Sequence, residues 1–387
     1  MKNKNVVFPN YDKCILNLIT SIIKYYGVET KYNGLVNVDK ILENNYENIV
    51  FIVLDGVGSN LLKEVSPNNL FMENKIDDIT SVYPSTTAAA INTYYSGMPP
   101  IETGWIGWSQ YFKEYGRAID IFRECDSYTK EKYPNAKTSI IDLINYKSIF
   151  EKIEESTNKE VKAYEINPTN CITRAKRCIK ADSIEYMCDA IEALCTNKDK
   201  NFIFAYSNLP DYILHEKGYN SEEIKRFIIE SEKSIGKLFE RLQKTNTLIL
   251  ISSDHGHNSV EKVYDIVELE DINDCLIMPP SLGERSLTFW VKEDRKEEFE
   301  NLFNSKFKDE FMLFTKKDFL EKHFLGYGNM HKKIDDFIGN YMAVSIGNSI
   351  IKLGTHISKD KYEKASTHCG LTSNEMIIPL IIKDLCK

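Results

Sequence analysis

The sequence lacks several features that would assign it to a functional class at once. Its 387 residues carry 49 Lys and Arg against 57 Asp and Glu, a net charge of -8, so no general positive charge attracts nucleic-acid phosphates or anionic membranes. No apolar run is long enough to cross a bilayer, and the first residues, MKNKNVVFPNYDK, hold no stretch of signal-peptide length. We therefore expect neither a nucleic-acid polymer nor a membrane as partner, and any anionic ligand must be held by a local site.

Cysteine pairs of the zinc-finger or redox type are also missing. The nine cysteines are scattered and form no CxxC pair, so we interpret them as reduced thiols of a cytoplasmic protein. The glycine pattern of a dinucleotide site is incomplete, because Gly56 and Gly58 are followed by Leu61 where a third glycine should stand. The share of hydrophobic residues, 42%, is enough for a large core in two domains or in one domain with an insertion.

Short apolar runs that end in polar residues predict the fold. NIVFIVLD at 48–55 is one, and similar runs occupy 201–211 and 246–257. Continuous apolar runs of this length are typical of strands buried on both faces of a parallel sheet. Segments with helical periodicity lie between them, for example 182–197 and 221–244. We predict an α/β fold with a mostly parallel central sheet flanked by helices.

Residues of the metal-ligand type gather where these runs end. They are Asp55 in FIVLDG, Asp211 and His215 in LPDYILH, and Asp254 and His255 in SSDHGHN. A fourth candidate position, His368 in STHCG, lies near the C-terminus. Each alone could cap a turn or form a surface pair, but three of only seven histidines stand here, where α/β sheets bind ligands. Carboxylates and imidazoles in this mixture suit zinc, or manganese where oxygens dominate. His257 could be a hydrogen-bond partner behind the ligands or a cap of the turn.

The stretch VYPSTTAAA at 82–90 places three hydroxyls before an alanine run. Ser and Thr accept hydrogen bonds from the first amides of a helix, and Ala favours the turns that follow. Ser85, Thr86 and Thr87 can therefore be read as a helix start or as the place of a nucleophile. The two interpretations are compatible, because one hydroxyl can cap while another reacts.

The order of these motifs resembles one known family. An Asp after the first strand, P-S/T-x-T, P-D-x-x-x-H, D-H-G and a late H-x-G occur here in sequence, over roughly 48–108, 201–258 and 365–382. The set is similar to the nucleotide pyrophosphatase/phosphodiesterase family of the alkaline phosphatase superfamily. The resemblance implies an alkaline-phosphatase-like core that hydrolyses phosphodiester or pyrophosphate bonds of small, nucleotide-type substrates.

The resemblance also implies roles for individual residues. Two divalent metal ions, zinc first and manganese as the alternative, would neutralise an anionic substrate. One ion would be held by Asp211, His215 and His368, and the other by Asp55, Asp254 and His255. The family motif places the nucleophile on Thr87, which would lie against the second ion and pass through a phosphothreonine intermediate.

From about 261 to 345, charged stretches of helical pattern alternate with probable strands. This part of the chain lies between two segments that carry candidate ligands. We expect 261–345 to be an inserted cap that selects the substrate, over a catalytic core made of 1–260 and 346–387. The family often has an asparagine about twenty residues after the nucleophile, where this chain has Trp108. Trp105 and Trp108 could form an aromatic wall for a flat leaving group, or they could simply pack.

Other functions fit the same motifs. A phosphomutase, a phosphomonoesterase or a phosphonate-cleaving hydrolase of the superfamily would use the same metals, and a binding protein could have kept the metals without turnover. The six ligand candidates are all present together with Thr87, which argues against the binding protein. The P-D-x-x-x-H arrangement favours the diesterase over the mutase.

Overall fold

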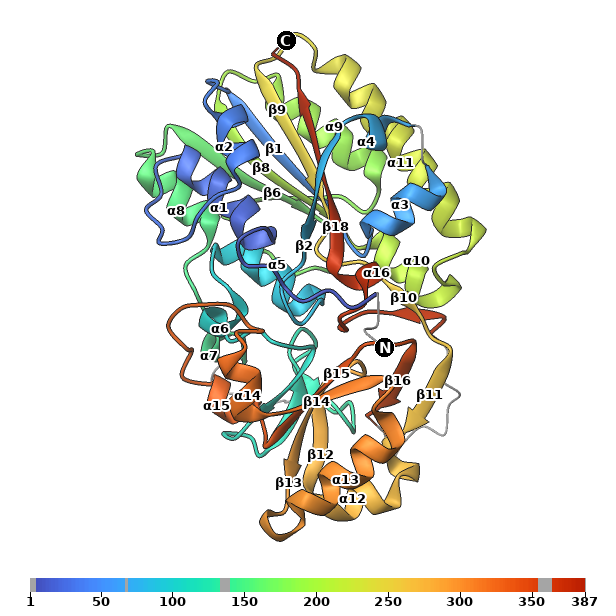
Figure 1. Cartoon of the computed structure of the whole chain (residues 1–387). Coiled ribbons are helices and arrows are strands. Elements are labelled where there is room, and N and C mark those ends of the chain that lie inside the picture. Colours follow the sequence, from blue (N-terminus) through green and yellow to red (C-terminus); the bar gives the residue numbers. More distant parts are fainter. Residues whose placement is uncertain (1–4, 67–68, 133–139, 354–363, 387) are drawn as a thin grey trace.

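The computed structural model describes residues 5–66, 69–132, 140–353 and 364–386. Two seven-stranded sheets dominate it, and they lie one beyond the other along the molecule (Figure 1). No helix of the described segments combines the length and the apolar character that crossing a bilayer requires. All nine cysteines are free thiols.

The main sheet contains the three apolar runs that were predicted as buried strands. Its order is β2-β18-β9-β1-β8-β6-β7. The strands are β1 (Asn48–Leu54), β2 (Lys75–Thr80), β6 (Val161–Asn167), β7 (Arg177–Lys180), β8 (Lys200–Ser207), β9 (Thr247–Ser252) and β18 (Ile377–Asp384). The pairings from β9 to β7 are parallel, whereas β18 runs antiparallel to both β9 and β2. The predicted α/β fold is confirmed, with a mixed sheet.

Helices cover both faces of the main sheet, which explains its continuous apolar strands. Successive side chains of a strand point to opposite faces, and every residue of β1 is buried. One face packs against α1 (Ile15–Tyr25), α2 (Val36–Leu42), α5 (Thr87–Ser96) and α8 (Ile149–Ser156). The other packs against α3 (Ser59–Val65), α4 (Leu70–Glu73), α9 (Ile184–Cys195) and α11 (Glu222–Arg241). Figure 1 shows these two helical layers on either side of the sheet.

The second sheet draws on two separate stretches of the chain. Its order is β14-β15-β13-β12-β3-β4-β5. The strands are β3 (Ser109–Phe112), β4 (Arg117–Asp120), β5 (Cys125–Asp126), β12 (Leu276–Leu282), β13 (Ser286–Val291), β14 (Phe311–Thr315) and β15 (Tyr341–Ser345). Segment 261–345, which we expect to be an inserted cap, supplies β12 to β15. Strands β3 to β5 come from 109–126, and β3 joins the sheet by pairing with β12.

Shorter elements complete the described chain. Two strand pairs connect the halves: β10 (Asn258–Ser259) with β17 (Ser366–Thr367), and β11 (Lys262–Asp265) with β16 (Ser349–Lys352). The remaining helices are α6 (Pro100–Thr103), α7 (Ile140–Leu143), α10 (Leu209–Lys217), η1 (Ile266–Glu268), α12 (Glu270–Cys275), η2 (Glu293–Arg295), α13 (Lys296–Phe307), α14 (Lys316–Glu321), α15 (Ile334–Phe337) and α16 (Ser373–Met376).

A buried ion pair joins the second sheet to the loop that carries His368. Arg285, between β12 and β13, donates from Nε and Nη2 to the two carboxylate oxygens of Glu375 at 2.7 and 2.8 Å, and neither side chain is exposed. Glu375 also accepts the backbone N–H of Gly370 at 2.7 Å. Bidentate pairs of this kind fix orientation as well as distance. The second sheet therefore helps to position the loop after β17.

Replacing Arg285 with methionine is expected to lower the free energy of unfolding by about 3–5 kcal/mol, because it leaves the Glu375 carboxylate buried without its partner. Denaturant unfolding followed by circular dichroism measures this loss. The matched control is Arg295→Met, which removes a partly exposed pair with Glu298 and should cost less than about 1 kcal/mol. Similar losses in the two variants would contradict the role given to Arg285.

Candidate active site

The parallel strands bring the predicted ligands to one edge of the main sheet. Because β1, β8 and β9 run parallel, the residues that follow them meet at the same edge. These residues, with the two that come from β17 and the start of α5, are Asp55, Thr87, Asp211, His215, Asp254, His255 and His368. The structure thus assembles all seven candidates, although they come from five separate segments.

Asp55, Asp254 and His255 form the first cluster, and their ligand atoms lie close enough to share one ion. His255 Nε2 is 3.4 Å from Asp55 Oδ1 and 3.4 Å from Asp254 Oδ2. The Thr87 hydroxyl lies 3.2 Å from the same Nε2 atom. Tyr206 donates a hydrogen bond to the other oxygen of Asp55. The hydroxyl of Thr87 therefore lies beside the cluster, where the family motif places a nucleophile.

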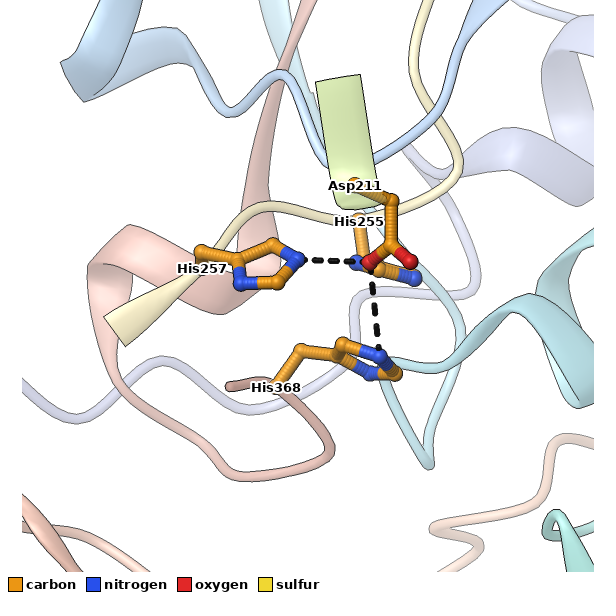
Figure 2. Close-up of side chains that lie close together, drawn as sticks. All are labelled: Asp211, His255, His257 and His368. Atoms are coloured by element: carbon orange, nitrogen blue, oxygen red, sulfur yellow. Dashed lines mark hydrogen bonds and ion pairs between the residues drawn. The ribbon is translucent and has the colours of Figure 1, made fainter. Parts of the chain in front are cut away.

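Asp211 is the centre of the second cluster. His215 Nε2 lies 3.4 Å and His368 Nε2 3.7 Å from Asp211 Oδ1. His257 Nε2 is nearer still, at 2.7 Å. Asp211, His255, His257 and His368 also lie close enough to share one ion, and Figure 2 shows their side chains converging. Imidazole His255 stands between the clusters, with its ring 3.9 Å from that of His368.

Backbone carbonyls determine which nitrogen of these imidazoles carries the proton. His215 Nδ1 lies 2.9 Å from the carbonyl oxygen of Ser366, and His368 Nδ1 lies 3.1 Å from that of Ser85. His255 Nδ1 lies 3.1 Å from the carbonyl oxygen of Gly256. A carbonyl only accepts, so Nδ1 donates and Nε2 keeps its lone pair. This is the arrangement that metal-binding histidines adopt.

The charges of the site favour the binding of a cation. Asp55 Oδ1 and Asp254 Oδ2 are buried and have no hydrogen-bond partner within the described segments. Burial raises the pKa of Asp55 well above its usual value, and the charges of Asp254 and Asp211 raise it further. Burial lowers the pKa of His215 and of His368, so these imidazoles are neutral. Buried carboxylates and neutral imidazoles that face one another fit divalent cations.

Thr87 is the first residue of α5, and Thr86 precedes it as the N-cap. The Thr86 side chain makes no capping hydrogen bond, and Ser85 Oγ instead donates to the carbonyl of Gly370 at 2.8 Å. The predicted capping by these hydroxyls is therefore wrong, and Ser85 ties the helix start to the loop of His368. The first amides of a helix lack partners within it and favour an anion, here next to Thr87.

The two tryptophans differ in their surroundings. Trp105 is fully buried, packs 5.3 Å from the ring of Phe122, and donates from Nε1 to the carbonyl of Ile144 at 2.9 Å. That burial argues against Trp105 as part of an aromatic wall, because neither face of its ring is open to a ligand. Trp108 is 37% exposed, so the wall remains a prediction for Trp108 alone.

His257 is the residue whose place the sequence interpretation left open. Its ring is fully buried and lies against the turn after β1, where Gly56 adopts φ +75°. A Cβ atom on Gly56 would lie 2.9 Å from His257 Cδ2. The sequence shows His257 as the second histidine of DHGH. Its role could not be read there, because that role depends on contacts with residues of other segments.

Comparisons with known proteins agree with this geometry. Residues 49–322 match the family model described as type I phosphodiesterase / nucleotide pyrophosphatase. A search of the curated proteins found no match to the chain.

Solved structures share the fold at low sequence identity. Murine ectonucleotide pyrophosphatase/phosphodiesterase 5, an inactive threonine-to-alanine variant in complex with AMP, is 16% identical with a TM-score of 0.63, over 86% of this chain and 87% of that one. The human form is 14% identical with a TM-score of 0.61 over the same shares. Phosphonoacetate hydrolase from Sinorhizobium meliloti 1021, in complex with phosphonoformate, is 14% identical with a TM-score of 0.58, over 86% and 89%. With the family model covering most of its length, the chain belongs to the type I phosphodiesterase / nucleotide pyrophosphatase family of the alkaline phosphatase superfamily.

Proposed function

We propose that the protein is a cytoplasmic, metal-dependent hydrolase of phosphodiester or pyrophosphate bonds in small nucleotide-type substrates. The observation that carries the proposal is the position of the Thr87 hydroxyl, 3.2 Å from His255 Nε2, at the edge of two clusters of buried carboxylates and imidazoles. The murine fold relative, inactive as a threonine-to-alanine variant and bound to AMP, supports a threonine nucleophile and a nucleotide ligand.

The metals are assigned by the chemistry of the donors. Asp211, His215 and His368 would hold one ion, and Asp55, Asp254 and His255 the other. The share of nitrogen ligands favours zinc over manganese. When bound, the ions would stabilise the ionised hydroxyl of Thr87 and the charge that develops on the leaving oxygen.

Groups of the protein itself carry out the remaining steps. The amides that open α5 hold a non-bridging phosphate oxygen near Thr87. Thr87 Oγ1, whose proton has passed to water, then attacks phosphorus. The bond from phosphorus to the leaving oxygen breaks, the leaving oxygen departs with the electron pair and takes up a proton from water, and the phosphoryl group stays on the threonine as an ester. Water cleaves that ester in the second step, which restores the hydroxyl. The ions held by the two clusters would supply the positive charge that an acidic protein otherwise lacks for an anionic substrate.

A substrate panel tests the proposal. The zinc-loaded protein should cleave bis(p-nitrophenyl) phosphate with a higher kcat/KM than p-nitrophenyl phosphate, and should leave a pentose phosphate and phosphonoacetate unchanged. A higher kcat/KM for p-nitrophenyl phosphate would indicate a phosphomonoesterase. Isomerised pentose phosphate would indicate a phosphomutase, and cleaved phosphonoacetate would indicate a phosphonate hydrolase.

We also propose that the second sheet, including segment 261–345, selects the substrate. Lys364 beside the site pairs with Glu284, between β12 and β13, at 3.5 Å, and Gly283 lies close enough for a Cβ atom to meet Cys369 Sγ at 3.3 Å. The β12–β13 turn therefore lies against the segment that carries His368. A lobe in this place can contact the part of a substrate that extends from the scissile phosphate.

Replacing Trp108 with alanine should raise KM for a dinucleotide substrate about 10-fold, because stacking of a base on an aromatic ring is worth about 1–3 kcal/mol. Bis(p-nitrophenyl) phosphate, which has no nucleobase, should be affected less. The control is Trp290→Ala, in β13 of the second sheet. It should change KM for neither the dinucleotide nor bis(p-nitrophenyl) phosphate. An unchanged KM for the dinucleotide would rule out Trp108 as the aromatic wall.

A further inference from the structure

Lys364 is a cationic side chain next to the site, and neither cluster uses it. The next residue, Ala365, donates its backbone N–H to the carbonyl oxygen of His215 at 2.8 Å. The chain at Lys364 is therefore fixed against α10, the helix that carries Asp211 and His215. The side chain of Lys364 is 46% exposed, so it borders the solvent on the Asp211 side of the site.

The ammonium group of Lys364 lies where the second sheet meets the main one. Nζ is 3.5 Å from Glu284 Oε2, in the turn between β12 and β13 whose Gly283 lies against Cys369. Partial burial favours the neutral amine, but the charges of Glu284 and Asp211 outweigh it and raise the pKa of Lys364. The group therefore stays protonated, and its charge acts on Asp211.

The pair with Glu284 does not prevent Lys364 from binding a ligand. A separation of 3.5 Å is longer than an ordinary N–H···O hydrogen bond of about 2.7–3.2 Å, and ion pairs exposed to solvent are weak. The lysine ammonium group also has three donors on a flexible stem. Nζ can therefore donate to an anion in the site without losing a strong contact.

The chemistry of the site determines which part of a substrate would lie near Lys364. In an in-line displacement, the leaving oxygen lies opposite the attacking oxygen. The Thr87 hydroxyl lies beside the Asp55 cluster, 3.2 Å from His255 Nε2, so the leaving oxygen faces the Asp211 cluster. The group attached to that oxygen then extends toward the solvent on the side of Lys364.

We propose that Lys364 Nζ binds a phosphate group on the leaving side of the substrate, so that a pyrophosphate bond is cleaved in preference to a diester whose leaving group carries no phosphate. The proposal rests on the proposed function, because that function places the scissile phosphorus between Thr87 and the Asp211 cluster. A lysine ammonium is a compact charge that suits phosphate oxygens. Its charge also stabilises the negative charge that grows on the leaving phosphate as the bond to phosphorus breaks.

The test compares two substrates that transfer the same group to Thr87. The leaving group of thymidine monophosphate p-nitrophenyl ester is nitrophenolate, whereas that of dithymidine pyrophosphate is thymidine monophosphate. Lys364→Gln should lower kcat/KM for the pyrophosphate about 10–100-fold, the range for loss of a hydrogen bond to a charged group. For the nitrophenyl ester, kcat/KM should fall less than about threefold, because a charge without a direct contact is screened.

Two further variants serve as controls. Lys217→Gln removes a half-exposed lysine at the end of α10 that pairs with Glu216 at 4.0 Å, and it should change kcat/KM for neither substrate. Lys364→Arg keeps the charge and should retain most of the preference for the pyrophosphate. Equal falls for both substrates in Lys364→Gln, or no fall for either, would overturn the proposal.

A binding measurement tests Lys364 without turnover. In zinc-loaded protein that also carries Thr87→Ala, Lys364→Gln should raise the Kd of dithymidine pyrophosphate about 10-fold and leave that of the nitrophenyl ester unchanged. Equal changes for the two ligands would overturn the proposal. In that event the wild type still cleaves the nitrophenyl ester, whereas a zinc-loaded wild type that cleaves neither substrate would contradict the proposed function itself.

Discussion

Replacing Thr87 with alanine is expected to abolish diester hydrolysis, with a loss of several orders of magnitude in kcat, while both metal ions stay bound. The six carboxylate and imidazole side chains assigned as ligands can hold the ions, whereas a methyl group provides no nucleophile. A nucleophile and the groups that activate it act as a unit, so removing it removes the covalent route entirely. Turnover and metal content are measured on the same preparation.

Two neighbouring hydroxyls provide matched controls for Thr87. Thr86 is the N-cap without a capping hydrogen bond, so Thr86→Ala should leave turnover near normal. Ser85→Ala removes the bond to the carbonyl of Gly370 and should lower stability by about 1–3 kcal/mol, with activity retained in the folded fraction. If Thr87→Ala keeps near-normal turnover and either control loses it, the nucleophile is misplaced. Activity in all three variants would contradict a covalent mechanism.

Replacing Asp55 with asparagine is expected to remove one of the two ions and nearly all activity, while it stabilises the metal-free protein. Without metal, Asp55 is a buried carboxylate whose pKa is raised by burial and by Asp254 and Asp211, so its charge costs free energy in the folded state. Asparagine removes that cost, but it also removes a ligand. The unfolding temperature should therefore rise without zinc, and zinc should raise it less than it does in the wild type.

Thermal unfolding with and without zinc, together with elemental analysis, checks this prediction. Asp182→Asn changes an exposed carboxylate that bonds Thr169 and should bind two ions like the wild type. An Asp55→Asn protein that retains both ions would remove Asp55 from the ligand set. A metal-free variant less stable than the wild type would show that Asp55 has a structural role instead.

The part of the fold that positions the site could be predicted from local sequence. The run 48–55 is apolar throughout and ends in Asp55, and the structure makes it the central strand β1 with both faces buried. Parallel strands deliver their last residues to one edge, so Asp55, Asp211 and Asp254 could be expected to meet. His368 and Thr87 were candidates by residue type, but only the order of motifs assigned them to that edge, because nothing in their local sequence links them to it.

Other features depend on partners that are distant in sequence. Strands β3 to β5 are short, and β3 joins the second sheet through β12, a pairing that no periodicity reveals. Burial of Trp105 follows from packing against Phe122 and from the carbonyl of Ile144. These are properties of assembled segments, which the sequence of any one segment does not contain.

The stereochemical course at phosphorus tests the central claim, a two-step displacement through Thr87, most directly. A chiral phosphorothioate diester is hydrolysed by the zinc-loaded wild type in isotopically labelled water, and the configuration of the product is determined. Each in-line displacement inverts phosphorus, so attack by Thr87 followed by attack by water predicts net retention. Net inversion would show that water attacks the substrate directly, and it would contradict the account.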